Sequence, residues 1–209
     1  MRALIVTDVQ VDFLPGGALQ VPGSDVIVPI INTILPYFPL VVAAQDWHPQ
    51  DHASFASNHP GRQPFEEIEL DGATQVLWPD HCVQGSPGAQ FPAALDTRRF
   101  EAIFRKGTDP SIDSYSSFFD NAHRKSTGLA DYLRGKGVTD LFLCGLAGDI
   151  CVYFSALDAL ALGFRVSFIR DAATPLDVAA HPARLETLAA RGARHVDSGS
   201  MREQGVAPC

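Results

Sequence analysis

Cys151 has the residue type and position expected of a catalytic nucleophile. It follows an apolar run and a glycine-rich turn at 145–150, and it stands near the start of a predicted helix. The N–H groups and dipole of a helix N-terminus favour a thiolate, and the same N–H groups can hold a developing oxyanion. A buried core cysteine is the alternative interpretation, and we apply it to Cys82, Cys144 and Cys209.

Asp8 and Lys106 each follow a short apolar run. A carboxylate beside a thiol can act as its base, and a lysine beside both can hold the two anions in place and lower the pKa of the thiol. Taken singly, each residue is more commonly a solvated charge at the end of a strand. Together with Cys151 they predict a nucleophile, its base and a supporting cation.

Four of the seven histidines lie between residues 48 and 81, in a region rich in proline, glycine and aspartate. Asp46 and His48 have the i, i+2 spacing that places two side chains on one side of an extended segment. Imidazole and carboxylate groups bind zinc, iron and manganese. Surface polar residues are the alternative, but we favour a metal site that includes Asp46, His48, His52 and His81. For His59 we leave open a supporting or surface position.

Three aromatic residues, Phe13, Trp78 and Tyr115, stand in polar, loop-like contexts. They could line a flat pocket for an aromatic ring. Core packing is the alternative for each of them.

The elements that would position these residues follow from the hydrophobic pattern. Short apolar runs predict strands at 2–8, 40–44, 102–105, 141–144, 165–169 and 194–196. Helices are expected from 24 or 25 to 34, from 126 or 127 to 135–137, at 150–162 and at 184–190. The residues from 49 to about 92 are expected to be irregular, and a loop region of this length is usually functional.

Strands that are apolar throughout and alternate with helices predict an α/β fold with a parallel sheet covered on both faces. We expect one domain over residues 1–209, with a metal-binding loop region at about 46–92. A parallel sheet binds its ligands beyond the carboxyl ends of its strands. Asp8, Asp46, Lys106 and the turn at 145–151 all follow predicted strands, so they should converge there.

Composition excludes several other classes of protein. A chain of 209 residues can bury a sizeable core, and 46% hydrophobic with 19% charged residues is the balance of a globular protein. A net charge of −8 argues against nucleic acid and anionic membranes as partners. Asp8 cuts short the first apolar run, so no signal peptide is expected, and acidic residues interrupt the run at 141–164. We expect a cytoplasmic protein and leave a homo-oligomer open.

Five segments, in this order, resemble motifs of the isochorismatase-like cysteine hydrolases and, within them, of the nicotinamidases. The opening strand motif is matched at 8–13 (Asp-Val-Gln-Val-Asp-Phe), the metal loop at 46–55, the last metal ligand at 78–83, the lysine segment at 105–110 and the nucleophile turn at 145–152. Any one match is weak, but jointly they are specific.

The resemblance implies a three-layer α/β/α fold and the hydrolysis of nicotinamide to nicotinate and ammonia in NAD salvage, with pyrazinamide as a further substrate. It implies a catalytic set of Cys151, Asp8 and Lys106. It implies one divalent metal ion, zinc first and iron or manganese as alternatives, on Asp46, His48, His52 and His81. It also implies a cis peptide between Leu146 and Ala147, which would present the Ala147 N–H to the oxyanion beside that of Cys151.

One residue departs from the family pattern: Gly148 stands where the family turn usually carries threonine. Two other functions stay open from the sequence. Relatives acting on carbamoyl or ureido substrates keep the cysteine, aspartate and lysine but generally lack the metal loop. A metal-binding or redox module without catalysis is the alternative from another class, and the absence of a C-x-x-C pair weakens its redox form.

Overall fold

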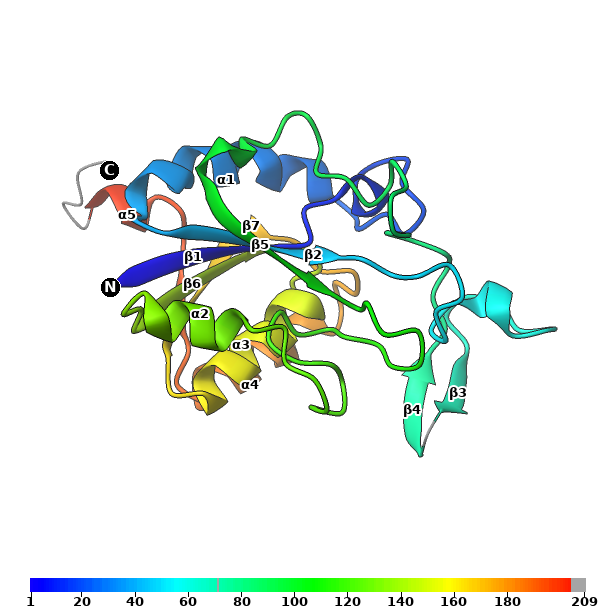
Figure 1. Ribbon diagram of the computed structural model, residues 1–209. Helices are drawn as coiled ribbons and strands as arrows, with labels where there is room; N and C mark the ends of the chain where they lie inside the picture. Colours follow the sequence, from blue (N-terminus) through cyan, green and yellow to red (C-terminus); the bar gives the residue numbers. More distant parts are fainter. Residues whose placement is uncertain (71, 204–209) are drawn as a thin grey trace.

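Six strands of the described residues form one sheet in the order β5-β2-β1-β6-β7-β8, and every pairing between neighbours is parallel (Figure 1). The computed structural model describes residues 1–70 and 72–203. The strands are β1 (Arg2–Thr7), β2 (Val41–Asp46), β5 (Phe100–Lys106), β6 (Asp140–Gly145), β7 (Arg165–Ala173) and β8 (Arg194–Val196). The expected parallel α/β sheet is therefore confirmed.

Helices cover both faces of this sheet. In Figure 1, α1 (Ile27–Ile34) lies above it, and α2 (Leu129–Gly135), α3 (Cys151–Ala161) and α4 (His181–Ala190) lie below. A short α5 (Ser200–Glu203) ends the described chain. Single turns of 3-10 helix occur at 11–13, 24–26, 35–37, 56–58 and 97–99.

The two faces of β1 explain why the sheet needs both layers. Leu4 and Val6 belong to the core beneath α1, whereas Ala3 and Ile5 belong to the core shared with α2, α3 and α4. Successive side chains of a strand point to opposite faces, so a continuous apolar run requires cover on both sides.

Some boundaries differ from the sequence prediction. The helix expected from residue 24 or 25 begins as a 3-10 turn and becomes α-helical at Ile27, so that Pro29 stands in the first turn, where its missing N–H costs little. β7 continues four residues beyond 169, to Ala173. α4 begins at His181, three residues before its predicted start.

The expectation that residues 49–92 are irregular is wrong for one part of this region. β3 (Glu67–Leu70) and β4 (Ala73–Val76) form an antiparallel hairpin that projects from the sheet (Figure 1). The hairpin is exposed on much of its surface and adds little to either core.

The strand register brings the carboxyl ends level with one another. Thr7 of β1 pairs with Ala44 of β2 and with Gly145 of β6, and Asp46 pairs with Lys106 at the end of β5. The candidate site lies at this edge. No helix in the described part of the chain is long and apolar enough to cross a membrane.

Candidate active site

Asp8, Lys106 and Cys151 meet at the carboxyl edge of the sheet, each placed by the end of an element. Asp8 follows β1, Lys106 is the last residue of β5, and Cys151 is the first residue of α3. The Lys106 ammonium forms an ion pair with Asp8 at 2.9 Å (Nζ to Oδ2) and lies 3.6 Å from the Cys151 sulfur. All three residues are buried. The structure therefore brings the predicted nucleophile, base and cation together.

Burial decides the protonation state of the thiol. It raises the pKa of Cys151 well above the ordinary value, Lys106 opposes this rise, and Asp8 adds to it. This direction is opposite to the lowering expected from the helix N-terminus and the lysine. The thiol is therefore protonated at neutral pH, so a base must remove its proton before the sulfur can attack.

The charges around this thiol are arranged to keep a base available. Burial raises the pKa of Asp8 to about 6, although Lys106 pulls it down. Burial by itself would lower the pKa of Lys106, but Asp46 and Asp8 raise it well above its ordinary value. At neutral pH the lysine is thus a cation between carboxylates, which is the arrangement that a proton-accepting Asp8 requires.

The turn before Cys151 has the geometry expected of an oxyanion site. The peptide between Leu146 and Ala147 is cis, as the resemblance implies. The N–H groups of Ile150 and Val152 both donate to the Ala147 carbonyl at 3.1 Å. No backbone carbonyl of the described residues accepts from the N–H of Ala147 or of Cys151. These two N–H groups are therefore the candidates for holding an oxyanion.

Gly148 is held by backbone contacts in this turn. Its N–H donates to the Thr174 carbonyl at 2.7 Å, and a Cβ added to Gly148 would lie 3.3 Å from the carbonyl oxygens of Ala173 and Thr174. A side chain at this position would press against the end of β7. The absence of the family's threonine therefore fits the close approach of the two segments.

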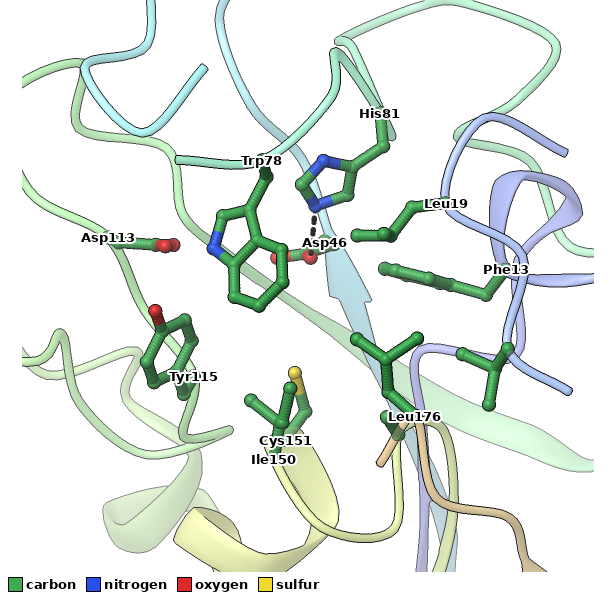
Figure 2. Close-up of a pocket in the computed structure, with 12 residues that line it drawn as sticks. Phe13, Leu19, Asp46, Trp78, His81, Asp113, Tyr115, Ile150, Cys151 and Leu176 are labelled. Carbon is green, nitrogen blue, oxygen red and sulfur yellow. Dashed lines mark ion pairs between the residues drawn. The ribbon is translucent and has the colours of Figure 1, made fainter. Parts of the chain in front are cut away.

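Asp46, His48 and His81 form a group of potential metal ligands. The Asp46 carboxylate lies 3.3 Å from His48 Nε2. It also lies 3.6 Å from His81 Nε2 (Figure 2). The opposite ring nitrogens are held from behind, since Nδ1 of His48 is 3.0 Å from the Gly107 carbonyl and Nδ1 of His81 is 2.8 Å from the Pro79 carbonyl. Such contacts fix a histidine with its Nε2 free to bind a metal.

Gly107 is required for the position of His48. Its φ is +63°, and a Cβ on it would lie 2.3 Å from Cε1 of the His48 ring. The glycine next to Lys106 therefore lets the histidine approach the backbone. Because Gly107 directly follows Lys106, the lysine and the residue that accommodates the His48 ring belong to the same short segment.

His52 belongs to a second group, with His48 and Asp113. Burial lowers the pKa of His52 to about 4, so the ring is neutral, and its Nε2 is buried without a hydrogen-bond partner. A neutral imidazole with an unpartnered buried nitrogen is chemically suited to bind a metal. His52 thus stays a predicted ligand. His59 lies outside both groups, with Nε2 2.7 Å from the Ala53 carbonyl.

A cavity joins the candidate nucleophile to the candidate metal ligands. Figure 2 shows Cys151 at one end, Asp46 and His81 at the other, and Phe13 and Trp78 on opposite sides of the space between. Tyr115 lies beside Trp78, with 6.3 Å between ring centres. The three aromatic residues singled out in the sequence therefore all line this cavity.

Several residues of the cavity were missed in the sequence. Asp113 is buried there and accepts hydrogen bonds from the Ser114 N–H at 2.7 Å and from Gln75 Nε2 at 3.1 Å. The apolar lining is completed by Leu19, Val21, Ile150 and Leu176. A signal for Asp113 existed, because it lies two residues before Tyr115 in a polar loop. The buried cysteines Cys82 and Cys144 are core residues as expected, and Cys209 lies outside the described residues.

The chain belongs to the isochorismatase family, whose domain matches residues 2–200. Among curated relatives, a nicotinamidase of Acinetobacter baylyi is 48% identical over 84% of this chain and 82% of its own length. A solved structure of the nicotinamidase/pyrazinamidase of Acinetobacter baumannii superposes with a TM-score of 0.93 and 44% identity, covering 96% of this chain and 97% of that one.

Two further solved structures hold ligands. A protein of L. infantum in complex with nicotinate has a TM-score of 0.85 and 40% identity, with 96% of this chain and 94% of that chain covered. The pyrazinamidase of Pyrococcus horikoshii in complex with zinc has a TM-score of 0.78 and 38% identity, with 94% and 98% covered. Both similarities extend over almost the whole fold.

Proposed function

We propose that this protein is a nicotinamidase that hydrolyses nicotinamide to nicotinate and ammonia, and pyrazinamide to pyrazinoate, in NAD salvage. The observation that carries the proposal is one cavity lined by Cys151, whose sulfur lies beside Lys106 and its ion-pair partner Asp8, and by Asp46 and His81 of the candidate metal group. The named relatives support the same reaction. We also propose a cytoplasmic location, where a free thiol such as that of Cys151 stays reduced.

In the first half of the reaction, Asp8 takes the proton of the Cys151 thiol as the sulfur attacks the amide carbon. The carbonyl oxygen becomes an oxyanion, which the N–H groups of Ala147 and Cys151 hold. Asp8 then gives its proton to the amide nitrogen, and the C–N bond breaks. Ammonia departs, and a thioester remains on Cys151. Lys106 stays charged beside Asp8 and keeps this carboxyl group in place.

In the second half, Asp8 removes a proton from a water molecule as its oxygen attacks the thioester carbon. The C–S bond breaks, nicotinate leaves, and the proton returns to the sulfur. Phe13 and Trp78 would hold the pyridine ring between them, and Tyr115 would border it. Over the cycle nicotinamide and water enter and nicotinic acid and ammonia leave, and these ionise in solution to nicotinate and ammonium.

Asp46, His48 and His81, with His52, would hold one divalent metal ion, and the donor set fits zinc first and iron or manganese as alternatives. When bound, the ion would supply an open coordination position for the nitrogen of a heteroaromatic ring. This position would select among amides by the ring that carries them, while the covalent steps stay with Cys151 and Asp8.

Elemental analysis of the purified protein should find about one divalent ion per chain. His81→Ala should lose it, because the variant removes one of three converging ligand atoms, and we expect the same of His52→Ala. His59→Ala is the matched control, since its ring lies outside both candidate groups, and it should keep the ion. A metal-free protein with full activity would contradict the metal site.

The ring nitrogen can be tested with three amides. Nicotinamide should turn over well, pyrazinamide measurably and benzamide much more slowly, because benzamide has the ring and the amide but not the nitrogen. The measurement is kcat/KM for ammonia release from each. Equal values for benzamide and nicotinamide would exclude a contact between ring nitrogen and metal. A preference for an aliphatic carbamoyl substrate would move the protein to another branch of the family.

A further inference from the structure

Gln10 is a fully buried glutamine whose side-chain carboxamide forms hydrogen bonds with the backbone of other segments. Its Nε2 donates to the Asp46 carbonyl at 2.8 Å and to the Ala89 carbonyl at 2.9 Å, and its Oε1 accepts from the Asp46 N–H at 2.8 Å. Both N–H bonds of the amide are therefore used. None of the catalytic steps described above involves this residue.

The path of the chain after β1 explains why a side chain is needed here. The last backbone hydrogen bond from β1 toward β2 runs from the Asp8 N–H to the Ala44 carbonyl, at 3.1 Å. Asp8 has a φ of +50°, which turns the chain out of the sheet. The next N–H and carbonyl on the same edge of β2 belong to Asp46, two residues on, and they have lost their strand partner.

The carboxamide of Gln10 replaces that partner. A glutamine amide carries the same donor and acceptor as a peptide group, so it pairs with the Asp46 N–H and carbonyl as a neighbouring strand would. Buried backbone groups left without a hydrogen-bond partner destabilise the fold. The sheet is thus extended by one pair of hydrogen bonds at the point where the chain must leave it.

Asp46 is the residue at which the two halves of the site meet. Its carboxylate lies 2.7 Å from Lys106 Nζ, 3.3 Å from His48 Nε2 and 3.6 Å from His81 Nε2. A small displacement of its backbone would therefore change both the metal ligands and the lysine beside Asp8. On the other edge of β2, the Trp47 N–H donates to the Lys106 carbonyl at 3.0 Å. On the edge that faces β1, the Asp46 N–H and carbonyl pair with Gln10.

We propose that Gln10 is a positioning residue that sets the metal affinity of the site by holding the backbone of Asp46. The proposal rests on the metal site of the proposed function, but not on the identity of the substrate. In this role the Gln10 amide takes the place of a neighbouring strand, and it links the segment that carries Asp8 to Asp46.

The test compares Gln10→Met with Gln45→Met. Methionine keeps the length and removes the hydrogen bonds in both. Gln45 is also buried and also donates to the Ala89 carbonyl, at 2.9 Å, but its amide forms no hydrogen bond with Asp46 and instead accepts one from Arg105. In titrations of the metal-stripped full chain with zinc alone, Gln10→Met should raise the Kd by about 10- to 100-fold. Gln45→Met should leave it unchanged.

Kinetics and folding complete the test. Circular dichroism first establishes that each variant is folded, and Gln10→Glu replaces Gln10→Met if the latter is not. Glutamate keeps an acceptor for the Asp46 N–H and loses at least one donor, so zinc affinity should again fall. With nicotinamide, excess zinc should restore part of the kcat/KM of a Gln10 variant.

A folded Gln10 variant that binds zinc as tightly as the wild-type protein would overturn the proposal. An equal loss of zinc affinity in the Gln10 and Gln45 variants would overturn it as well. Failure of the proposed function is a different result: the wild-type protein would then release no ammonia from nicotinamide, while the zinc titrations would still separate Gln10 from Gln45.

Discussion

Cys151→Ala should abolish ammonia release from nicotinamide while the protein stays folded. The sulfur is the only atom in the proposed cycle that bonds to the amide carbon before water does, so its removal leaves the oxyanion site and the base without a nucleophile. We expect kcat to fall by about 10⁴-fold or more. The measurements are steady-state ammonia release at saturating nicotinamide and the far-ultraviolet circular dichroism of the variant.

Cys144→Ala is the matched control. Cys144 is also a buried free thiol, but it lies within β6 with its sulfur 3.6 Å from the Ile5 carbonyl, and it does not border the cavity. This variant should keep its catalytic constants and lose some thermal stability through a small cavity. Activity of Cys151→Ala within tenfold of the wild type would show that the mechanism is wrong.

The sheet could be predicted because its strands are apolar on both faces. Residues 3–6 are completely buried, and a run of this kind has few alternatives once helices alternate with it. The order of the strands in the sheet could not be predicted in this way. β1 lies between β2 and β6, which are separated by about a hundred residues of sequence, and this arrangement depends on packing that no local pattern records.

The hairpin of β3 and β4 was missed although its signal was present. Glu67-Ile-Glu-Leu70 alternates polar and apolar residues, and an Asp-Gly pair separates it from the next strand. The surrounding histidines, prolines and glycines outweighed this short pattern. The long-range contact of Gln10 had no such local signal, because its partner Asp46 is 36 residues away.

The direction of the Cys151 pKa shift was also beyond the sequence. Residue types alone indicate a helix N-terminus and a nearby lysine, both of which lower the pKa of a thiol. The extent of burial depends on how α3 packs against the sheet, and burial outweighs the opposing effect of Lys106 on the pKa of the thiol. Because the thiol is protonated, its attack requires a base, which is the role that the sequence predicts for Asp8.

Asp8→Asn should therefore reduce kcat by about 10²-fold or more, the usual size of a general-base effect. Asparagine has nearly the same shape and cannot accept the thiol proton. In the wild type, Asp8 accepts this proton only when it is ionised. Since burial raises its pKa to about 6, kcat/KM should be highest above this pH and should fall as the pH drops through it.

Alkylation of Cys151 by iodoacetamide separates the base from a merely structural carboxylate. Asp8 raises the pKa of the thiol through its charge. Asp8→Asn removes this charge, so the pH profile of alkylation should move toward lower pH while turnover falls. The thiol would thus become easier to ionise in a variant that is less active, which is the result expected if Asp8 is needed to move protons during the reaction. If Cys151 titrates identically in the wild type and in Asp8→Asn, the two groups are not coupled and Asp8 is not the base.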